Sequence, residues 1–299
     1  MEKKNLHFIT NFMSTEDLTN WQSKIYTDDN NEWDGRITID YKKPADYYVI
    51  CNHPFYKSKK QHYDPSRTIV YHVEPMVTRH RWNNWSNQET FLHKFEDKNI
   101  AHWGISWNMN ELKTKPIFKL EEDKNKISTI TSDLSYLPGH KLRLNFLKYL
   151  DVLPRFNITP DIYGRNTLGD KSPLIKLKNY RGGLNGDTRK DGGLMKYHYH
   201  FAGENTQENG YFSEKLMDSI LLENLTFYHG CPNVNKWIDE RAFIKIDLNR
   251  PKHSLKIIVN AMKNNEREKR LKYIKEAKQK ILNELNIMPY VDSIINKKM

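Results

Sequence analysis

The 299-residue sequence has little cysteine and no long apolar run. Its two cysteines, Cys51 and Cys231, lie far apart and have neither the spacing of a zinc site nor that of a disulfide framework, so a reducing compartment is expected. No apolar run approaches the roughly 20 residues of a membrane span. The N-terminus turns polar at Thr10, too early for the core of a signal peptide. We therefore expect a cytoplasmic protein that is soluble or at most peripheral to a membrane.

Several catalytic and cofactor motifs are also missing. The sequence contains no P-loop, no GxGxxG after a predicted strand, no HExxH and no GxSxG. Asp28-Asp29 resembles half of an acidic metal motif, but it lies in the polar segment Tyr26–Glu32, where an ordinary solvated turn is the better explanation. We expect no metal ion and no bound cofactor.

The composition is that of a globular, basic protein. Hydrophobic residues make up 37% of the chain and aromatic residues 12%, which excludes a disordered chain. The net charge of +11 is compatible with a nucleic acid, an anionic membrane surface or an anionic substrate. Lys, Asn and Ile are abundant along the whole chain, as an AT-rich genome would produce without any binding role, so the charge alone does not choose a partner.

Short apolar runs alternate with helical patterns, which predicts an α/β protein with mostly parallel sheets. The length suits two domains, and the charged stretch from 119 to 126 places their boundary. We predict an N-terminal domain over 1–125, a C-terminal domain over 126–285 and a tail over 286–299. The predicted strands are Leu6–Ile9, Tyr47–Cys51, Thr68–Val73, Ile127–Thr131, Ile158–Tyr163, Leu225–Tyr228 and Ala242–Ile246.

Helix signals lie between these strands. Ser14 and the acids after it indicate a helix start, and apolar stripes predict helices over 142–150 and 212–221. The segment from Asn264 to Leu285 predicts a basic helix whose apolar side packs against the core, in preference to a membrane or coiled-coil role. The stretch from 170 to 193 is an irregular loop without an assigned role.

The segment from Tyr197 to Lys215 predicts an aromatic strand, a polar turn and a helix start. A helix that begins at the carboxyl end of a parallel strand presents unpaired N–H groups and a positive dipole end, which suit a diphosphate. Lys215 stands in the first turn, where an acid is favoured, so we interpret it as the partner of a bound anion. Glu214 and Tyr211 are candidates for ligand contacts, although an isolated Glu-Lys pair is more often an exposed surface pair.

This segment closely resembles the signature of the α-1,3/1,4-fucosyltransferases, glycosyltransferase family 10. Members carry a strand ending in Phe-Glu-Asn-Ser/Thr, a turn with Tyr, and Thr/Ser-Glu-Lys at a helix start. The strand and Gly-x-Pro loop over 224–232 and the strand over 242–246 are similar too, while Gly203 departs from the family's usual Phe. The resemblance implies a donor-binding role for Glu204, Asn205, Tyr211, Ser213, Glu214 and Lys215.

Two weaker blocks occur in the expected order. The pattern from 128 to 150 predicts a strand, a Pro-Gly-His loop and a helix, and the resemblance places Arg143 of that helix on the donor diphosphate. A guanidinium fork suits phosphate oxygens. The segment Asp161–Arg165 is similar to the family's Val-Asp-x-Tyr-Gly strand end.

In the N-terminal half, the strand predicted over 68–73 is followed by Glu74, which resembles the family's strand-end Glu. Sites in α/β folds lie at the carboxyl ends of parallel strands, so Glu74 is the candidate catalytic base. Asn52 and His53 follow the strand over 47–51 in the same way, and Arg79 lies in a basic loop; these are candidates for the acceptor side. The region over 82–116 does not align with the family.

The resemblance implies a GT-B fold with two Rossmann-like domains facing across a cleft. It also implies inverting transfer of L-fucose from GDP-β-L-fucose to a hydroxyl of a glycan, without a metal. We expect a GDP-sugar donor and a glycan acceptor as partners and no nucleic acid. Three alternatives remain open: another nucleotide sugar, a basic nucleic-acid-binding protein and an inactive glycan-binding relative. Peripheral membrane contact, the oligomeric state and the acceptor are left open as well.

Overall fold

The computed structural model describes residues 3–79, 85–87, 89–95, 100–184 and 186–296. The chain divides into two compact units. Unit 1 comprises Met1–Ile100, Trp107–Lys115 and Leu282–Met299, and unit 2 comprises Ala101–Ser106 and Pro116–Ile281. The chain therefore leaves and re-enters each unit, in contrast to the single boundary predicted at 125/126.

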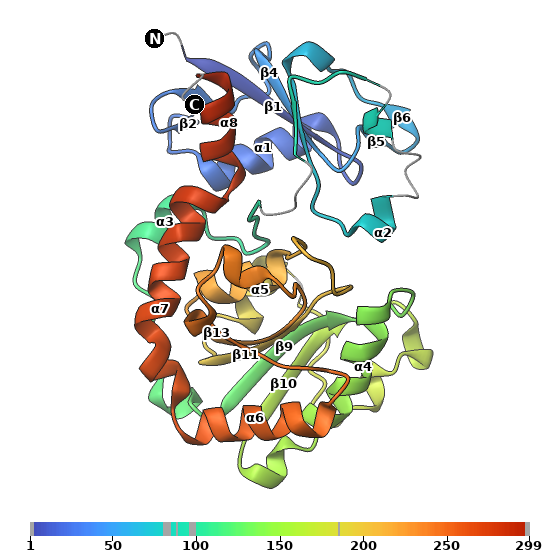
Figure 1. Cartoon of the computed structure of the whole chain (residues 1–299), viewed down its shortest axis with the longest axis vertical. Coiled ribbons are helices and arrows are strands. Elements are labelled where there is room, and N and C mark those ends of the chain that lie inside the picture. The colour runs from blue at the N-terminus through green and yellow to red at the C-terminus, as the bar shows by residue number, and fades with distance from the viewer. Residues whose placement is uncertain (1–2, 80–84, 88, 96–99, 185, 297–299) are drawn as a thin grey trace. The chain divides into compact units, whose positions relative to one another are not determined.

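Unit 1 is built, within its described residues, on a six-stranded sheet in the order β2-β3-β1-β4-β7-β8 (Figure 1). Neighbouring strands are parallel except in the β2–β3 hairpin. The strands are β1 (Lys4–Thr10), β2 (Glu32–Trp33), β3 (Ile37–Thr38), β4 (Tyr47–Cys51), β7 (Thr68–Tyr71) and β8 (His93–Lys94), with a separate hairpin of β5 (Phe55–Tyr56) and β6 (Lys59–Lys60). The helices are α1 (Thr15–Tyr26), α2 (Met76–Arg79), α3 (Met109–Thr114) and α8 (Ile287–Ile295).

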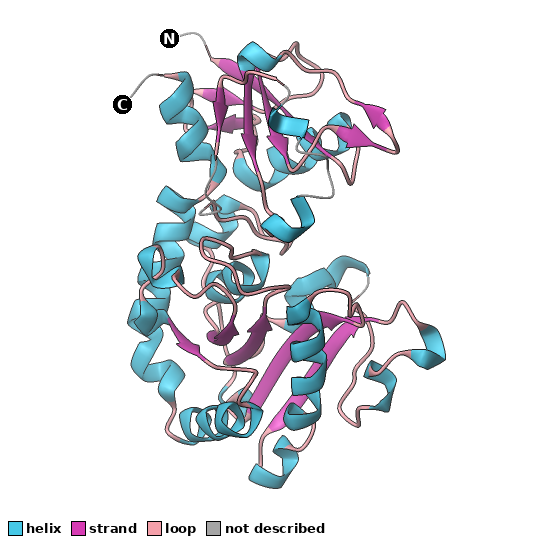
Figure 2. Ribbon diagram, turned by 45° about the vertical axis from the view of Figure 1, so that its right-hand side comes forward, coloured by secondary structure: helices cyan, strands magenta, loops and turns pink. Residues whose placement is uncertain are grey.

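The described part of unit 2 has a five-stranded, fully parallel sheet in the order β10-β9-β11-β12-β13. Helix α4 contacts β11, α5 contacts β11 and β12, and α7 contacts β12, whereas α6 contacts the helices α4 and α7 (Figures 1 and 2). The strands are β9 (Lys126–Ser132), β10 (Thr159–Arg165), β11 (Tyr199–Gly203), β12 (Leu225–His229) and β13 (Phe243–Lys245). The helices are α4 (Pro138–Leu150), α5 (Glu214–Leu221), α6 (Pro251–Lys263) and α7 (Glu266–Lys280).

All seven apolar runs form strands, as predicted, because strands of a parallel sheet are buried on both faces and read as continuous apolar segments. Every residue of β11 and β12 is buried. Two of the polar side chains among them are paired inside unit 2: the Nδ1 of His200 lies 2.8 Å from the Ser128 hydroxyl, and the Thr226 hydroxyl donates to Ser219 at 2.7 Å. The predicted α/β class with two Rossmann-like units, the building plan of GT-B, is confirmed. The cleft between the units stays a prediction.

The helix starts follow the predicted signals. The Ser14 hydroxyl accepts a hydrogen bond from the N–H of Asp17 at 3.1 Å and caps α1. The predicted helices over 142–150 and 212–221 correspond to α4 and α5. Helix α7 and the π-helical turn Ile281–Leu285 bury the expected side of the basic C-terminal segment, including Ile274, Ala277 and Ile281. None of the helices in the described ranges combines the length and apolar character that crossing a membrane requires.

The last segment differs from the predicted tail. From Leu282 onward the chain belongs to unit 1, and α8 carries Ile287, Met288 and Val291 at 1% exposure or less. The Asn286 side chain accepts from the N–H of Met288 at 3.0 Å and caps the helix. The C-terminal residues therefore complete the core of the N-terminal unit.

Met288→Ala tests this role of α8. Removing a fully buried Met side chain leaves a cavity, so the free energy of unfolding should fall by about 2–5 kcal/mol. Met76→Ala is the control, because Met76 is 49% exposed in the same unit. Thermal and urea unfolding of both variants provide the comparison. Equal stability of the two variants would show that α8 does not form part of the core.

Candidate functional site

The sheet of unit 2 has a topological switch point between β9 and β11, because the chain connections that follow these two neighbouring strands run in opposite directions along the sheet. Strand β9 is followed by α4 and then by β10 on one side of it, whereas β11, on the other side, is followed by α5 and β12. In open parallel sheets ligands bind at such switch points, outside the carboxyl ends of the strands. The beginnings of α4 and α5 therefore define the candidate site.

Glu204 follows β11 directly and fixes the start of α5. It is 1% exposed, and its carboxylate accepts from the N–H of Ser213 at 2.9 Å and from the Ser213 hydroxyl at 2.6 Å. The Tyr228 hydroxyl donates to the same carboxylate at 3.3 Å. Ser213 is also the N-cap of α5. These bonds hold the end of β11 and the first turn of α5 together.

Two glycines permit this close packing. A Cβ on Gly230 would lie 2.4 Å from Cγ of Glu204, and a Cβ on Gly139, in the first turn of α4, would lie 2.2 Å from the Glu204 carbonyl oxygen. The N–H of Gly139 instead donates to the carbonyl of Asn205 at 3.0 Å. The starts of α4 and α5 are thereby attached to the same short segment, 204–205.

Arg143 points from α4 toward this segment. It is 4% exposed, and its Nη1 donates to Oδ1 of Asn205 at 2.8 Å. Its Nε is also buried and has no hydrogen-bond partner among the described residues. Burial lowers the pKa of Arg143, yet the group stays cationic because a guanidinium is not deprotonated in proteins. A buried N–H without an acceptor is costly, and an anionic ligand oxygen is the chemistry that would satisfy it.

His140 lies in the same turn of α4 and is 1% exposed. Burial, together with the positive charge of Arg143, lowers the pKa of His140 to about 4. The imidazole is therefore neutral at pH 7 and adds no charge to the site.

Lys215 and Glu214 form the first turn of α5. The Lys215 ammonium lies 3.2 Å from Oε1 of Glu214 and 3.7 Å from Oε2 of Glu204. Burial raises the pKa of Glu214, but the ammonium groups of Lys190 and Lys215 outweigh this effect and hold it well below its usual range. Lys215 is thus engaged by carboxylates that a bound anion would have to replace.

Three charged or titratable residues near Glu214 were not predicted from the sequence. Lys190 lies 3.2 Å from Glu214 and 3.2 Å from Asp218, and His102 lies 3.5 Å from Glu214. His102 and Lys190 come from the region over 82–116 and the loop over 170–193, where no motif indicated a role. The i, i+4 spacing of Glu214 and Asp218 on one helix face was the signal available in the sequence.

The remaining predicted donor-binding residues have buried or half-buried side chains. Tyr211 is 1% exposed, and Ser213 is 2% exposed. Asn205 is half-buried and holds Arg143 through its side chain. At Gly203, a Cβ would lie 3.3 Å from Cβ of Arg143, so the departure from Phe leaves room for that arginine.

In unit 1, the predicted acceptor-side residues follow the carboxyl ends of β4 and β7. Asn52 is 2% exposed with φ of 70°, and its side chain accepts from the N–H of Val73 at 3.0 Å. It therefore joins the ends of the two strands. His53 accepts from the N–H of Phe55 at 3.3 Å, and burial lowers its pKa. Arg79 ends α2, and its side chain lies outside the described residues.

Glu74 lies three residues beyond the end of β7 and is half-buried. Burial raises the pKa of Cys51, at the end of β4, to about 12; a hydrogen bond with Tyr71 acts against this rise, and the nearby charge of Glu74 adds to it. The Glu74 carboxylate is thus close to the carboxyl end of the neighbouring strand. Glu74 belongs to unit 1, whereas the predicted donor-binding residues belong to unit 2.

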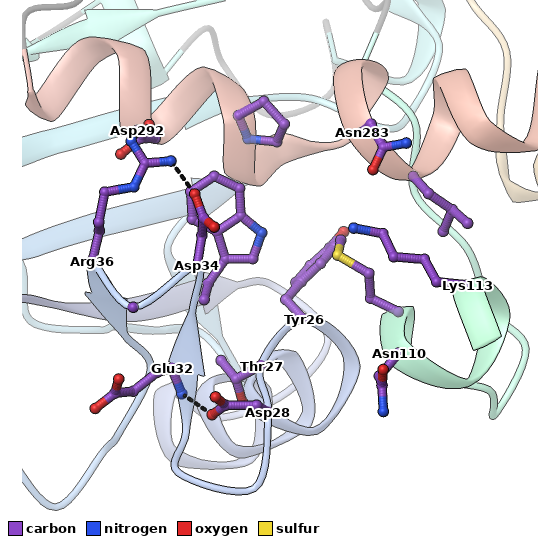
Figure 3. A pocket seen from close by; sticks show the side chains of 15 residues that line it. Tyr26, Thr27, Asp28, Glu32, Asp34, Arg36, Asn110, Lys113, Asn283 and Asp292 are labelled. Carbon is purple, nitrogen blue, oxygen red and sulfur yellow. Dashed lines mark hydrogen bonds and ion pairs between the residues drawn. The ribbon is translucent and has the colours of Figure 1, made fainter.

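Unit 1 also contains a cavity of about 580 Å³ between the end of α1, the β2–β3 hairpin, α3 and α8 (Figure 3). Arg36 on its wall pairs with Asp34 and, at 2.7 Å, with Asp292. None of the predicted site residues lines this cavity. It is a feature separate from the strand ends at which Asn52, His53 and Glu74 lie.

Metal ligands do not gather in the part of the chain that the structure describes. No three His, Cys, Asp or Glu side chains there are arranged to hold a metal ion. Cys51 and Cys231 are buried free thiols. The expectation of metal-free chemistry stays a prediction.

No protein-family profile matches the sequence, but several solved structures are similar. An α1,3-fucosyltransferase with GDP shares 16% identity over 96% of this chain and 94% of that chain, with a TM-score of 0.46. A mutant of S. aureus TarM in complex with UDP shares 13% identity over 84% and 50% of the two chains, with a TM-score of 0.47. A glycosyltransferase from Rickettsia africae shares 9% over 98% and 78%, with a TM-score of 0.49. These values describe similarity of fold and leave family and substrate open.

Glu204→Ala tests the structural role of this carboxylate. Each buried donor left without an acceptor costs about 1–3 kcal/mol, so the free energy of unfolding should fall by at least that amount, and the variant should melt at a lower temperature. Gln207→Ala, an exposed position in the same loop, should remain within about 0.5 kcal/mol of the wild type. A wild-type melting temperature for Glu204→Ala would contradict the assignment.

Proposed function

We propose that the protein is an inverting glycosyltransferase that moves L-fucose from GDP-fucose to a hydroxyl of a glycan. The observation that carries the proposal is the gathering of Arg143, Lys215 and the first turns of α4 and α5 at the switch point of a parallel sheet. Both positive side chains and helix N-termini favour a diphosphate. The choice of GDP-fucose rests on the resemblance of the segment from Tyr197 to Lys215 to glycosyltransferase family 10.

Arg143 and Lys215 act on the leaving group in this proposal. As the bond between the anomeric carbon and the donor phosphate breaks, negative charge grows on the diphosphate. A guanidinium with an unused buried Nε and an ammonium at a helix start are positioned to stabilise that charge without reorganising solvent. These two cations and the helix dipoles supply the neutralisation that a divalent metal gives in other transferases, so the proposed reaction is metal-independent.

Glu74 acts on the acceptor. A sugar hydroxyl is a poor nucleophile at neutral pH, so its proton must be accepted while its oxygen bonds to the anomeric carbon. The proton passes to the Glu74 carboxylate, the oxygen–carbon bond forms on the face opposite the leaving group, and GDP departs with the electron pair. This displacement converts a β-linked donor into an α-linked fucoside.

Three other interpretations predict different behaviour. A transferase for another nucleotide sugar would use the same phosphate-binding groups with another base or sugar. A nucleic-acid-binding protein would lose affinity steeply as salt increases, and the polar cluster at the start of α5 has no function in it. An inactive glycan-binding relative would bind ligand without turnover.

Nucleotide binding gives the first test. GDP and GDP-fucose, but not UDP, should raise the melting temperature, because the donor site exists only in the folded protein. A hundredfold excess of ligand over its dissociation constant stabilises by about 2.7 kcal/mol, or roughly 4–8 °C. Arg143→Ala should reduce the shift, whereas Arg155→Ala, an exposed site after α4, should retain it. Equal shifts with UDP would overturn the guanosine assignment.

The second test concerns the base. Glu74→Gln keeps the shape of the side chain and removes its basicity, so turnover should fall by about 10²–10⁴ while the affinity for GDP stays nearly constant. Glu16→Gln, on the exposed side of α1, is the control for loss of one carboxylate in unit 1. Circular dichroism and melting curves check that both variants are folded. Near wild-type turnover by folded Glu74→Gln would place the base elsewhere, with Glu204 or His53 as the next candidates.

A further inference from the structure

The carboxylate of Glu214 is shared by several basic side chains. Its Oε1 lies 3.2 Å from the ammonium of Lys215 and 3.2 Å from that of Lys190, while its Oε2 lies 3.5 Å from Nε2 of His102. The two lysines thus contact the same oxygen. A change at either one alters the charge that the other must balance.

Lys190 is held in place from its other side. Its ammonium lies 3.2 Å from Oδ2 of Asp218, a residue that is 2% exposed, and the other Asp218 oxygen accepts from the N–H of Gly104 at 2.7 Å. Gly104 leaves the space that Lys190 occupies, because a Cβ there would lie 2.8 Å from Nζ of Lys190. Lys190 is therefore packed into a fixed place between two carboxylates of α5.

We propose that Lys190 is a positioning residue for the donor site: by neutralising Glu214, it allows the ammonium of Lys215 to leave that carboxylate and bind the donor diphosphate. This inference rests on the proposed function. Lys215 has to exchange its carboxylate partners for phosphate oxygens when the donor binds. The exchange is favourable only if each carboxylate that it leaves keeps another partner.

The two carboxylates that hold Lys215 differ in this respect. Glu204 keeps the N–H and hydroxyl of Ser213 and the hydroxyl of Tyr228. Glu214 keeps Lys190, and it keeps His102 as an ionic partner only when that imidazole is protonated. Without Lys190, Glu214 and the buried Asp218 would face each other one turn apart with Lys215 as the nearest ammonium. The ammonium of Lys215 would then stay paired with Glu214 and would not be available to the ligand.

The experiment measures GDP affinity by calorimetry for the wild type, Lys190→Gln and Lys190→Arg. Loss of one charged hydrogen-bonding partner should weaken GDP binding about tenfold to a hundredfold in Lys190→Gln, and Lys190→Arg should recover most of it. Lys176→Gln is the matched control, because it removes an exposed lysine from the same loop. Lys190→Gln alone leaves the buried carboxylate of Asp218 without its ammonium partner, which could unfold α5. The double variant Lys190→Gln, Asp218→Asn removes that carboxylate as well, so it separates the loss of Lys190 from unfolding of α5.

A double-mutant cycle with Glu214→Gln distinguishes positioning from direct contact. If Lys190 acts through Glu214, the effect of Lys190→Gln on GDP affinity should become small in the Glu214→Gln background. An undiminished effect in the Glu214→Gln background would show that Lys190 contacts the ligand itself, and this would overturn the inference. A GDP affinity of Lys190→Gln within about twofold of the wild type would show that Lys190 has no role in binding, and this would overturn the inference too. Failure of the wild type to bind GDP overturns the proposed function and the inference that depends on it.

Discussion

The candidate site depends on the hydrogen bonds between the buried carboxylate of Glu204 and Ser213. The carboxylate joins the end of β11 to the first turn of α5 through both donors of Ser213. The neighbouring Asn205 binds Gly139 of α4 through its carbonyl and Arg143 through its side chain. A single dipeptide after β11 therefore sets the position of both helix starts and of one cation. Rigid elements are the supports that hold a binding constellation to the required precision.

Charge balance is the second constraint on the site. Lys190 and Lys215 form ion pairs with the carboxylates of Glu204, Glu214 and Asp218, so neither ammonium group lacks an acidic partner. Ligand binding at such a site exchanges one set of ionic partners for another, and the net affinity depends on how well the displaced carboxylates remain satisfied. Arg143 Nε is the exception, since it has no partner among the described residues.

Strands and helix starts were predictable because their signals are local. Apolar runs marked the parallel strands, and Ser14 and Ser213 marked helix starts. The end of β7 was placed two residues too late, because Val73 is apolar but its N–H bonds to the Asn52 side chain and not to a neighbouring strand. The return of α8 to unit 1 depends on contacts distant in sequence, which a short apolar segment does not reveal.

The same distinction applies to the site. Arg143, Asn205 and Lys215 lie in segments whose resemblance to the family motif predicted a donor-binding role for each of them. Lys190 and His102 come from irregular segments without periodicity, and only the folded chain brings them to Glu214. Charged residues that pair over a long sequence distance have no characteristic spacing, so the sequence alone does not identify such pairs.

We propose that this chain transfers fucose from GDP-fucose by direct displacement. The most direct measurement incubates the protein and labelled GDP-β-L-fucose with a glycan array in the presence of EDTA, followed by NMR of a labelled product. We expect transfer to at least one glycan and an α-fucosidic linkage. Transfer from UDP-sugars but not from GDP-fucose, dependence on added metal, or a β-linked product would contradict it.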